Sequence, residues 1–342
     1  MTSLLIGSIN TPGPWFHATG EGVTRCDLDE ATGAISRARS FPEFENAIWM
    51  TRVGQFTFVA TERFLEGGEV SAFDPTMART GPMQKAPGGA ICHLALSPDG
   101  KTLYTVSYLG GVTAHAVDER GVISPAHQEI NYTGSGADKE RQEKPHPHQA
   151  VVSPDGKHLF VCDLGCDKVW VHRIEGGKLN PAVALDAPAG SGPRHLVFHP
   201  RLPRFYLLGE IDSQVRVYEG AGANWKLVGS HTAISTGFTG AAHGGAIRLH
   251  PSGQTLAVSV RGSDNIAVFR LDRQGDLTPA ANFPTGGKCP RDFDFTPSGR
   301  RLVALNQDSD HLVAHGFDPD AGLPTGHAGA PFAIGCPMCV IF

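Results

Sequence analysis

The sequence of 342 residues contains no long apolar run and no segment with a sustained helical period. A membrane-spanning helix needs about 20 consecutive apolar residues, so we expect no such helix and no membrane partner. The sequence also lacks a surplus of positive charge, because 29 Lys and Arg stand against 34 Asp and Glu, giving a net charge of −5. Nucleic-acid-binding proteins carry a strongly basic face, so we expect no nucleic-acid partner.

The cysteines give little support for disulfide bonds. There are seven, an odd number, and most lie within apolar runs. Reduced thiols in a cytoplasmic protein are the simpler interpretation, and the start, MTSLLIGSIN, lacks the charged and long apolar regions of a signal peptide. Cys336 and Cys339 form a C-x-x-C pair, but no helix follows them, so we expect a structural role for them and for Cys162 and Cys166.

Glycine and proline, in contrast, are abundant. The 42 Gly and 25 Pro are spread evenly along the chain rather than gathered in a tail. This distribution favours many tight turns over a disordered region. With no helix expected beyond a turn or two, the composition predicts an all-β protein.

A turn of the form Pro-Asp/Ser-Gly recurs along the chain, at 98–100, 154–156, 251–253 and 297–299. Each copy is followed by an apolar run, a polar turn and another apolar run. Two degraded copies place the equivalent turn residue at 54 and 202, so six copies follow one another at spacings of 46, 56, 46, 51 and 46 residues. Repeats of about 40–50 residues with four strands each are typical of a β-propeller.

The two ends of the chain supply a seventh copy. The N-terminal residues contain strand-like segments without the first strand of the unit, and the C-terminal CPMCVIF is an isolated strand. We therefore predict one domain over 1–342, a seven-bladed β-propeller of four-stranded antiparallel blades whose ring is closed by strands from both termini. The predicted blades are 1–40 with 335–342, 41–87, 88–142, 143–189, 190–239, 240–286 and 287–334.

The copy at 190–218 shows where chemistry is expected. Its three short apolar runs read as an antiparallel meander, so the first strand begins where the second ends. This brings Arg194, His195 and Glu210 to one edge, although the last is 15 residues away from its nearest partner. A guanidinium, an imidazole and a carboxylate at one edge form a candidate acid/base site, and we predict these three residues to be catalytic.

Counting from the turn residue gives the equivalent positions in the other copies. Eight residues before it stand Asn46, Cys92, His148, Arg194, Gly245 and Arg291. Seven before it stand Ala47, His93, Gln149, His195, Ala246 and Asp292. Seven after it stand Thr61, Ser107, Asp163, Gly209, Val260 and Asn306. Eight after it stand Glu62, Tyr108, Leu164, Glu210, Arg261 and Gln307.

These positions are unusually polar for the ends of buried strands, which points to a ligand site at one mouth of the channel. Arginine is suited to carboxylate and phosphate groups, so we expect a small anionic substrate. The predicted substrate-binding residues are His93, His148, Arg261, Arg291, Tyr108, Asp163, His243 and Asn306. No acidic cluster accompanies the histidines and no glycine-rich loop opens a helix, so we expect no metal ion and no cofactor.

Several segments resemble the seven-bladed propeller lactonases, which include bacterial propeller-type 6-phosphogluconolactonases and fungal carboxymuconate cyclases. They are GSGPRHLVFHP, CHLALSPDG, HPHQAVVSPDG, RGSDNIAVF, CPRDFDF and the closing GCPMCVIF. The resemblance covers nearly the whole chain and implies a cytoplasmic, cofactor-free enzyme that opens or closes a lactone. The chain departs from the family pattern at Ala246, Gly209 and Val260, so its lactone need not be 6-phosphogluconolactone.

The favoured hypothesis is lactone hydrolysis, with Glu210 or His195 as the base and an arginine stabilising the oxyanion. His93 and His148 are candidates to protonate the leaving alkoxide. One alternative is a lactonising cycloisomerase of carboxymuconate-type acids, which uses the same arginines but protonates carbon. Another is a non-catalytic binding propeller, whose function would not depend on these residues. We expect a monomer or a weak dimer.

Overall fold

The computed structural model describes residues 1–342, which form two compact units. Unit 1 comprises 1–46, 199–219 and 227–342, and unit 2 comprises 47–198 and 220–226. Nearly all regular structure is β-strand, and the only helical segments are two 3₁₀ turns of three residues each. No helix is therefore long enough to cross a membrane. The single domain expected over 1–342 stays a prediction.

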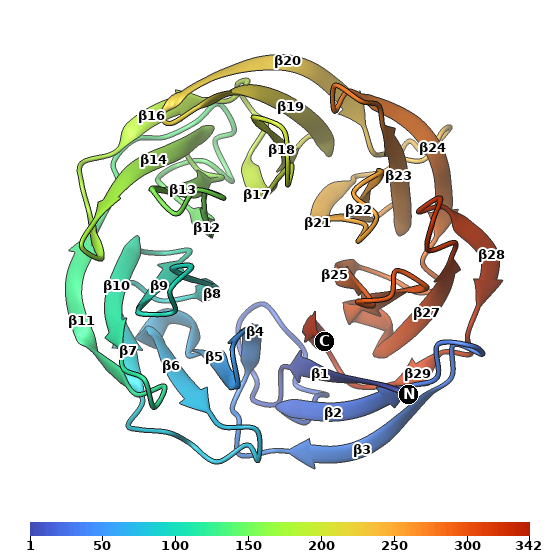
Figure 1. Ribbon diagram of the computed structural model, residues 1–342, viewed down its shortest axis with the longest axis horizontal. Coiled ribbons are helices and arrows are strands. Elements are labelled where there is room, and N and C mark those ends of the chain that lie inside the picture. Colours follow the sequence, from blue (N-terminus) through green and yellow to red (C-terminus); the bar gives the residue numbers. More distant parts are fainter. The chain divides into compact units, whose positions relative to one another are not determined.

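Unit 2 contains three complete sheets and one further strand (Figure 1). The first sheet holds β4 (Ala47–Val53), β5 (Phe56–Glu62), the turn η1 (Phe64–Glu66), β6 (Gly68–Phe73) and β7 (Gln84–Ala86). The second holds β8 (Ile91–Leu96), β9 (Thr102–Ser107), β10 (Val112–Val117) and β11 (Ile123–Ile130). The third holds β12 (Pro147–Val152), β13 (His158–Asp163), β14 (Lys168–Glu175), β15 (Lys178–Leu179) and β16 (Val183–Asp186). The further strand is β17 (Pro193–Phe198).

Unit 1 contains the remaining strands. One of its sheets holds β1 (Thr2–Ser8), β2 (Val23–Leu28), β3 (Ile35–Phe41) and β30 (Pro337–Ile341). The next strands along the chain are β18 (Arg204–Gly209), β19 (Gln214–Ala221) and β20 (Asn224–Thr232). Another sheet holds β21 (His243–Leu249), β22 (Thr255–Arg261), β23 (Asn265–Leu271) and β24 (Leu277–Pro284). The last holds β25 (Pro290–Phe295), β26 (Arg301–Asn306), the turn η2 (Gln307–Ser309), β27 (His311–Phe317), β28 (Pro324–Ala328) and β29 (Phe332–Ala333).

The prediction of four-stranded antiparallel blades is confirmed. The strands form seven sheets, and every strand lies within its predicted blade except β3, which ends one residue beyond the predicted limit, at Phe41. In two sheets the outermost strand is divided into two short pieces, β15 with β16 and β28 with β29. The C-terminal β30 pairs with β1 from the other end of the chain, with Ile341 opposite Leu5, as predicted for ring closure.

The recurring Pro-Asp/Ser-Gly segment folds as a tight turn between the first and second strands of a sheet. Gly100 has a φ of 69° and Gly156 a φ of 72°, a left-handed conformation that glycine adopts without a steric penalty. Asp99 accepts hydrogen bonds from the hydroxyl of Ser97 and the amide of Lys101. The turn therefore fixes which residues of the two strands face each other.

The first strands β4, β8, β12, β21 and β25 each carry a β-bulge close to the start. Pro147 lies opposite Asp163 and Gln149 opposite Cys162, which leaves His148 as the extra residue. Pro290 and Asp292 flank Arg291 in the same way. Because a bulge changes the direction in which a side chain points, this recurring irregularity positions polar side chains at one edge of the sheets.

The predicted alignment is wrong in the sheet that contains β4. Its hairpin is short, with Val53 opposite Phe56, whereas Leu96 lies opposite Leu103 in the next sheet with six residues between them. The bulge therefore falls just before Trp49, five residues before the turn residue Gly54. Trp49, and not Ala47, is the structural equivalent of His93.

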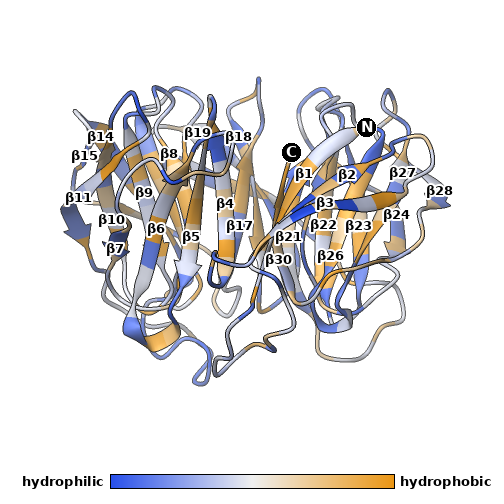
Figure 2. Cartoon of the chain, turned by 90° about the horizontal axis from the view of Figure 1, so that it is seen from below, coloured by the Kyte–Doolittle hydropathy of each residue, from blue (hydrophilic) through white to orange (hydrophobic).

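The second strands form the centre of the hydrophobic core. Every residue of β9, β18 and β26 is buried, and Figure 2 shows hydrophobic residues along much of β22, β23 and β26. One cluster in unit 1 contains Ala246, Ala257, Ile266, Val268, Phe293, Phe295, Leu302, Ala304 and Phe317. The outer strands β11 and β24 are largely exposed, so the core lies between neighbouring sheets.

Buried histidines recur in the sheets. His115, His172 and His315 occupy similar positions on the third strands β10, β14 and β27, and one ring nitrogen of each contacts a backbone carbonyl. His199 and His250 follow first strands β17 and β21. Burial lowers the pKa of all five imidazoles below the ordinary value.

These histidines make stability depend on pH. A folded-state pKa below the unfolded value of about 6.5 means that the unfolded chain binds more protons, so stability is complete above about pH 6.5 and declines as the pH falls. We expect the thermal midpoint to drop by several degrees between pH 7.5 and 5.5. Calorimetry of His115→Gln should show a flatter pH profile than the wild type, whereas His327→Gln, at an exposed position, should leave the profile unchanged. Identical profiles for both variants would contradict this account.

Candidate active site

In unit 2, side chains from four consecutive first strands form one aromatic and imidazole cluster. Trp49 lies on β4, His93 on β8, His148 on β12 and His195 on β17. The ring centroid of His93 lies 4.3 Å from that of Trp49, and the centroid of His195 lies 5.7 Å from Trp49 and 5.2 Å from His148. The three predicted histidines are therefore brought together, with a tryptophan that the sequence analysis did not select.

Arg194 joins this cluster through a hydrogen bond from its guanidinium to Nε2 of His148. A guanidinium has no acceptor atom, so Nε2 of His148 must accept and the imidazole is neutral with its proton on Nδ1. The residue Arg194 is only 3% exposed. A cation this deeply buried must be stabilised by its surroundings, and His148 is one of the groups that contact it.

Tyr108 and Asp163 lie beside this cluster with different surroundings. The Tyr108 ring stacks on His146 at 4.2 Å and meets the edge of His148 at 6.0 Å. The Asp163 carboxylate accepts hydrogen bonds from the amides of His146 and Gly165 and from Nε1 of Trp170. Burial raises the pKa of Asp163 despite these bonds. Its contacts are those of a group that fixes the loop before β12, and its predicted role in substrate binding stays a prediction.

In unit 1, Glu210 directly follows β18 and forms an ion pair with Arg261 at the end of β22. The distance from Arg261 Nη2 to Glu210 Oε2 is 3.0 Å, and only 5% of the glutamate side chain is exposed. The same Nη2 donates to the carbonyl of Gly244 at 2.8 Å. The Glu210 carboxylate therefore helps to orient the guanidinium of Arg261.

Arg291, at the bulge of β25, has different partners. Its Nη1 donates to Oε1 of Gln307 at 3.3 Å, and its guanidinium carbon lies 5.0 Å from the ring centroid of Phe16. Burial and the charge of Arg261 lower the pKa of Arg291. Both direct partners are neutral, so the positive charge of Arg291 is not balanced by a carboxylate contact.

The two remaining predicted residues lie in the same sheets. His243 begins β21 and lies opposite Arg261 in the ladder. Asn306 ends β26, is fully buried, and donates to the carbonyl of Thr285 at 3.4 Å. Their roles in substrate binding stay predictions.

Arg194 and His195 belong to unit 2 and Glu210 to unit 1. The expected approach of these three residues, and a site at the mouth of a channel, stay predictions. What the structure establishes is two polar clusters, each built at the ends of the first and second strands.

The cysteines show no sign of redox chemistry in their geometry. All seven are free thiols, and six of them are buried. Burial raises the pKa of Cys336 to about 12, which suppresses the reactive thiolate. No group of three or more His, Cys, Asp or Glu side chains is arranged to hold a metal ion.

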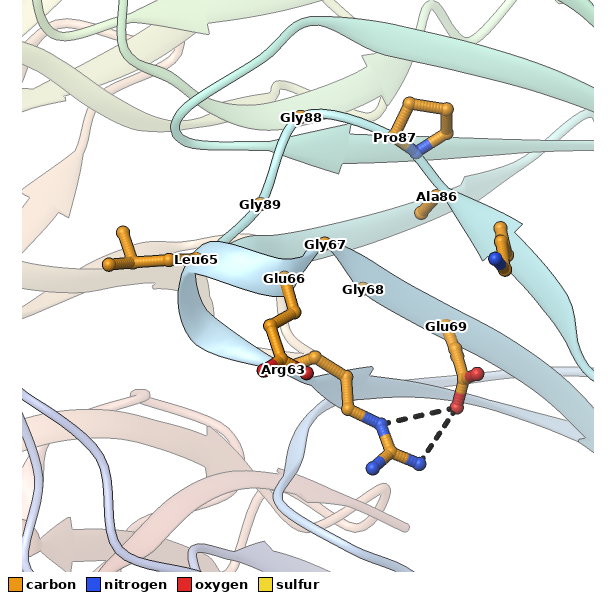
Figure 3. A pocket seen from close by; sticks show the side chains of 11 residues that line it. Arg63, Leu65, Glu66, Gly67, Gly68, Glu69, Ala86, Pro87, Gly88 and Gly89 are labelled. Carbon is orange, nitrogen blue, oxygen red and sulfur yellow. Dashed lines mark hydrogen bonds and ion pairs between the residues drawn. The ribbon is translucent and has the colours of Figure 1, made fainter.

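The structure also contains a cavity of about 760 Å³ that none of the predicted residues lines (Figure 3). It lies in unit 2 between η1 and the loop before β8, bordered by glycines at 67, 68, 88 and 89. Its two cations, Arg63 and Lys85, are matched in number by Glu66 and Glu69, and Arg63 pairs with Glu69 at 3.1 Å. With its charge balanced internally, this cavity is less suited to an anion than the two polar clusters.

Comparisons with known proteins agree with this architecture. Residues 3–342 match the family described as "Lactonase, 7-bladed beta-propeller". A 6-phosphogluconolactonase of Bacillus subtilis (strain 168) is 28% identical over 340 residues, covering 96% of this chain and 97% of that protein. The crystal structure of a periplasmic gluconolactonase from Pseudomonas aeruginosa has a TM-score of 0.89 at 27% identity, covering 99% and 98% of the two chains.

A structure from Lactobacillus plantarum with no stated activity has a TM-score of 0.87 at 25% identity and covers 99% of this chain and 98% of its own. The names of the relatives differ in substrate and in compartment, so they leave both open for this protein. The match over nearly the full length, together with the seven four-stranded sheets and the terminal strand pair, shows that the chain belongs to the seven-bladed β-propeller lactonase family.

Proposed function

We propose that the protein hydrolyses a small anionic sugar lactone in the manner of a 6-phosphogluconolactonase. The observation that carries this proposal is the buried contact of Arg194 with a neutral His148, next to His195. Hydrolysis of a lactone needs a base for the attacking water, a cation for the oxyanion and an acid for the leaving alkoxide. Imidazoles and a buried guanidinium supply all three without a cofactor.

We assign the base to His195 and the oxyanion contact to Arg194. The carbonyl oxygen of the substrate takes the hydrogen bond of Arg194, which frees Nε2 of His148 to accept a proton. The proton that His195 removes from the attacking water then passes to the ring oxygen as the C–O bond breaks, either directly or through His148 or His93. Glu210 is better suited to orienting Arg261 than to removing a proton, because its carboxylate is already ion-paired.

Steady-state hydrolysis of a panel of sugar lactones by His195→Ala, Arg194→Ala and Glu210→Gln tests these roles. The first two variants should lose about 10²–10³-fold in kcat, as expected for removal of a general base or an oxyanion donor. The exposed variant His127→Gln serves as a control for handling and folding. Wild-type rates in all three site variants would refute the assignment, and the absence of lactone hydrolysis by the wild type would refute the function.

A further inference from the structure

Asp167 lies in the turn between β13 and β14, and its side chain joins two loops from different parts of unit 2. Oδ1 accepts hydrogen bonds from Nε2 of Gln142 at 2.7 Å and from the amide of Gly192 at 2.8 Å. Oδ2 accepts from the amide of Gly190 at 2.7 Å, and the hydroxyl of Ser191 donates to Oδ1 at 3.3 Å. Three of these four donors belong to the loop before β17, and the fourth belongs to the connection before β12.

Gln142 fixes that connection, residues 131–146 between β11 and β12, to the β13–β14 turn. The residue is only 1% exposed. Its Nε2 also donates to the carbonyl of Leu164 at 2.7 Å, and its Oε1 accepts from the amide of Asp138 at 2.8 Å. Because a buried amide that loses its partners is costly, these contacts hold the connection in one place beside Asp167.

The two loops lead to the two partners of the contact between Arg194 and His148. His148 is the extra residue of the bulge at the start of β12, and Arg194 follows the loop that Asp167 binds. Beyond Arg194, the amide of Leu196 donates to Oε1 of Gln149 at 2.6 Å, which joins β17 to β12. Arg194 is therefore held between two fixed points, Asp167 before it and Gln149 after it.

Equivalent carboxylates in unit 1 show which part of this arrangement belongs to the fold. Asp264 and Asp310 directly precede the third strands β23 and β27, as Asp167 precedes β14, and all three have a φ between 49° and 53°. Asp264 accepts the amide of Cys289 before β25, and Asp310 accepts the amide of Cys336 before β30. Asp167 differs in being only 7% exposed and in its contact with a neighbouring connection.

We propose that Asp167 and Gln142 are positioning residues that set the placement of Arg194 against His148. The inference rests on the proposed lactonase function, and it gives the connection 131–146 a part in the reaction. In the proposed hydrolysis the guanidinium of Arg194 must reach the carbonyl oxygen of the substrate. A displacement of about 1 Å at such a group lowers a rate by as much as about 100-fold, so the loop that precedes Arg194 has to be held firmly.

Asp167→Asn tests this role in steady-state lactone hydrolysis. The carboxylate accepts donors on both oxygens, whereas asparagine offers one oxygen, so at least one donor loses its acceptor. We expect kcat to fall by about 10–100-fold, with KM changed by less than about threefold. Asp310→Asn, which removes the equivalent acceptor before β30, is the matched control and should lower the melting temperature without changing kcat. A wild-type kcat in Asp167→Asn, or an equal loss in both variants, would overturn the proposal.

Two further variants separate the positioning of Arg194 from a general loss of folding. Gln142→Met keeps the length of the side chain and leaves the loop amides on Asp167, so it tests the same contact even if Asp167→Asn does not fold. It should lower kcat by about 3–10-fold. In an Arg194→Ala background, Asp167→Asn should lower kcat by less than about twofold, because the group that it positions is already gone. An undiminished loss in that background would contradict the proposal.

If the wild type hydrolyses no lactone, the proposed function fails, but the positioning role is still measurable by NMR. Nε2 of His148 accepts from Arg194, which places the proton on Nδ1, and long-range nitrogen–proton correlation spectra distinguish the two tautomers. His148→Gln identifies the signals. Asp167→Asn should shift them towards the tautomer with the proton on Nε2, and Asp310→Asn should leave them in place. Unchanged His148 signals in Asp167→Asn would overturn the inference, whether or not the protein is a lactonase.

Discussion

Replacing Arg261 with methionine is expected to lower the free energy of unfolding by about 3–5 kcal/mol at pH 7. The variant removes the guanidinium that lies 3.0 Å from the carboxylate of Glu210, whose side chain is only 5% exposed. Loss of this cation removes the Coulombic attraction that offsets the cost of burying the carboxylate. Chemical denaturation of the wild type and the variant, with m-values compared, measures the difference.

The pH dependence of this penalty gives a second measurement. Removal of a cation that lies 3.0 Å from a buried carboxylate makes the ionised carboxylate less favourable, so the folded variant takes up a proton more readily than the folded wild type. The destabilisation is therefore largest at neutral pH and shrinks as the pH falls towards the unfolded value of about 4.3.

A double variant identifies the source of the effect. Glu210→Gln combined with Arg261→Met removes both charges and should recover most of the lost stability, because neutral groups cost less to bury. A double variant as unstable as Arg261→Met alone would show that lost packing of the arginine, rather than the lost charge contact with Glu210, causes the loss of stability.

The fold was predictable because each copy of the repeat contains a turn whose residue types can be recognised in the sequence. Gly100 and Gly156 adopt the positive φ that their turns require, and each turn fixes the pairing of the strands on either side. The terminal β30 was predictable for a related reason, since CPMCVIF had no partner of its own and the first copy lacked a strand. Local sequence and the requirement to pair every edge strand therefore determined the sheets.

The candidate site was predictable only in part. The count from the turn residue found His148 and Arg291 because their strands share one bulge position. It failed for Trp49, because a hairpin that is shorter than the others shifts the count by two residues. Phe16 was missed for another reason: it lies in a connection outside the repeat, where no periodic pattern indicates which side chain contacts a strand.

Removal of the last eight residues, 335–342, is expected to abolish the native fold. The truncation takes away β30, in which Met338, Cys339 and Val340 are each at most 2% exposed, and leaves β1 as an unpaired edge. Loss of a single large buried side chain costs about 2–5 kcal/mol, and a whole domain is stable by only about 5–15 kcal/mol. We expect insoluble protein, or a soluble form without a cooperative thermal transition.

A circular permutant distinguishes strand pairing from chain length as the cause. Ile341 pairs with Leu5, so a short Gly/Ser linker from Phe342 to Met1 retains the β1–β30 pair. The new ends are opened before the exposed Gly176, where no atom lies within 4 Å of the position that a Cβ would take. This permutant should keep a cooperative transition close to that of the wild type, and a synthetic peptide of 335–342 added during refolding should partly rescue the truncated chain. A truncated chain with a wild-type melting temperature would show that β30 contributes little, since the exposed edge of β1 and the opened core would then have no measurable cost.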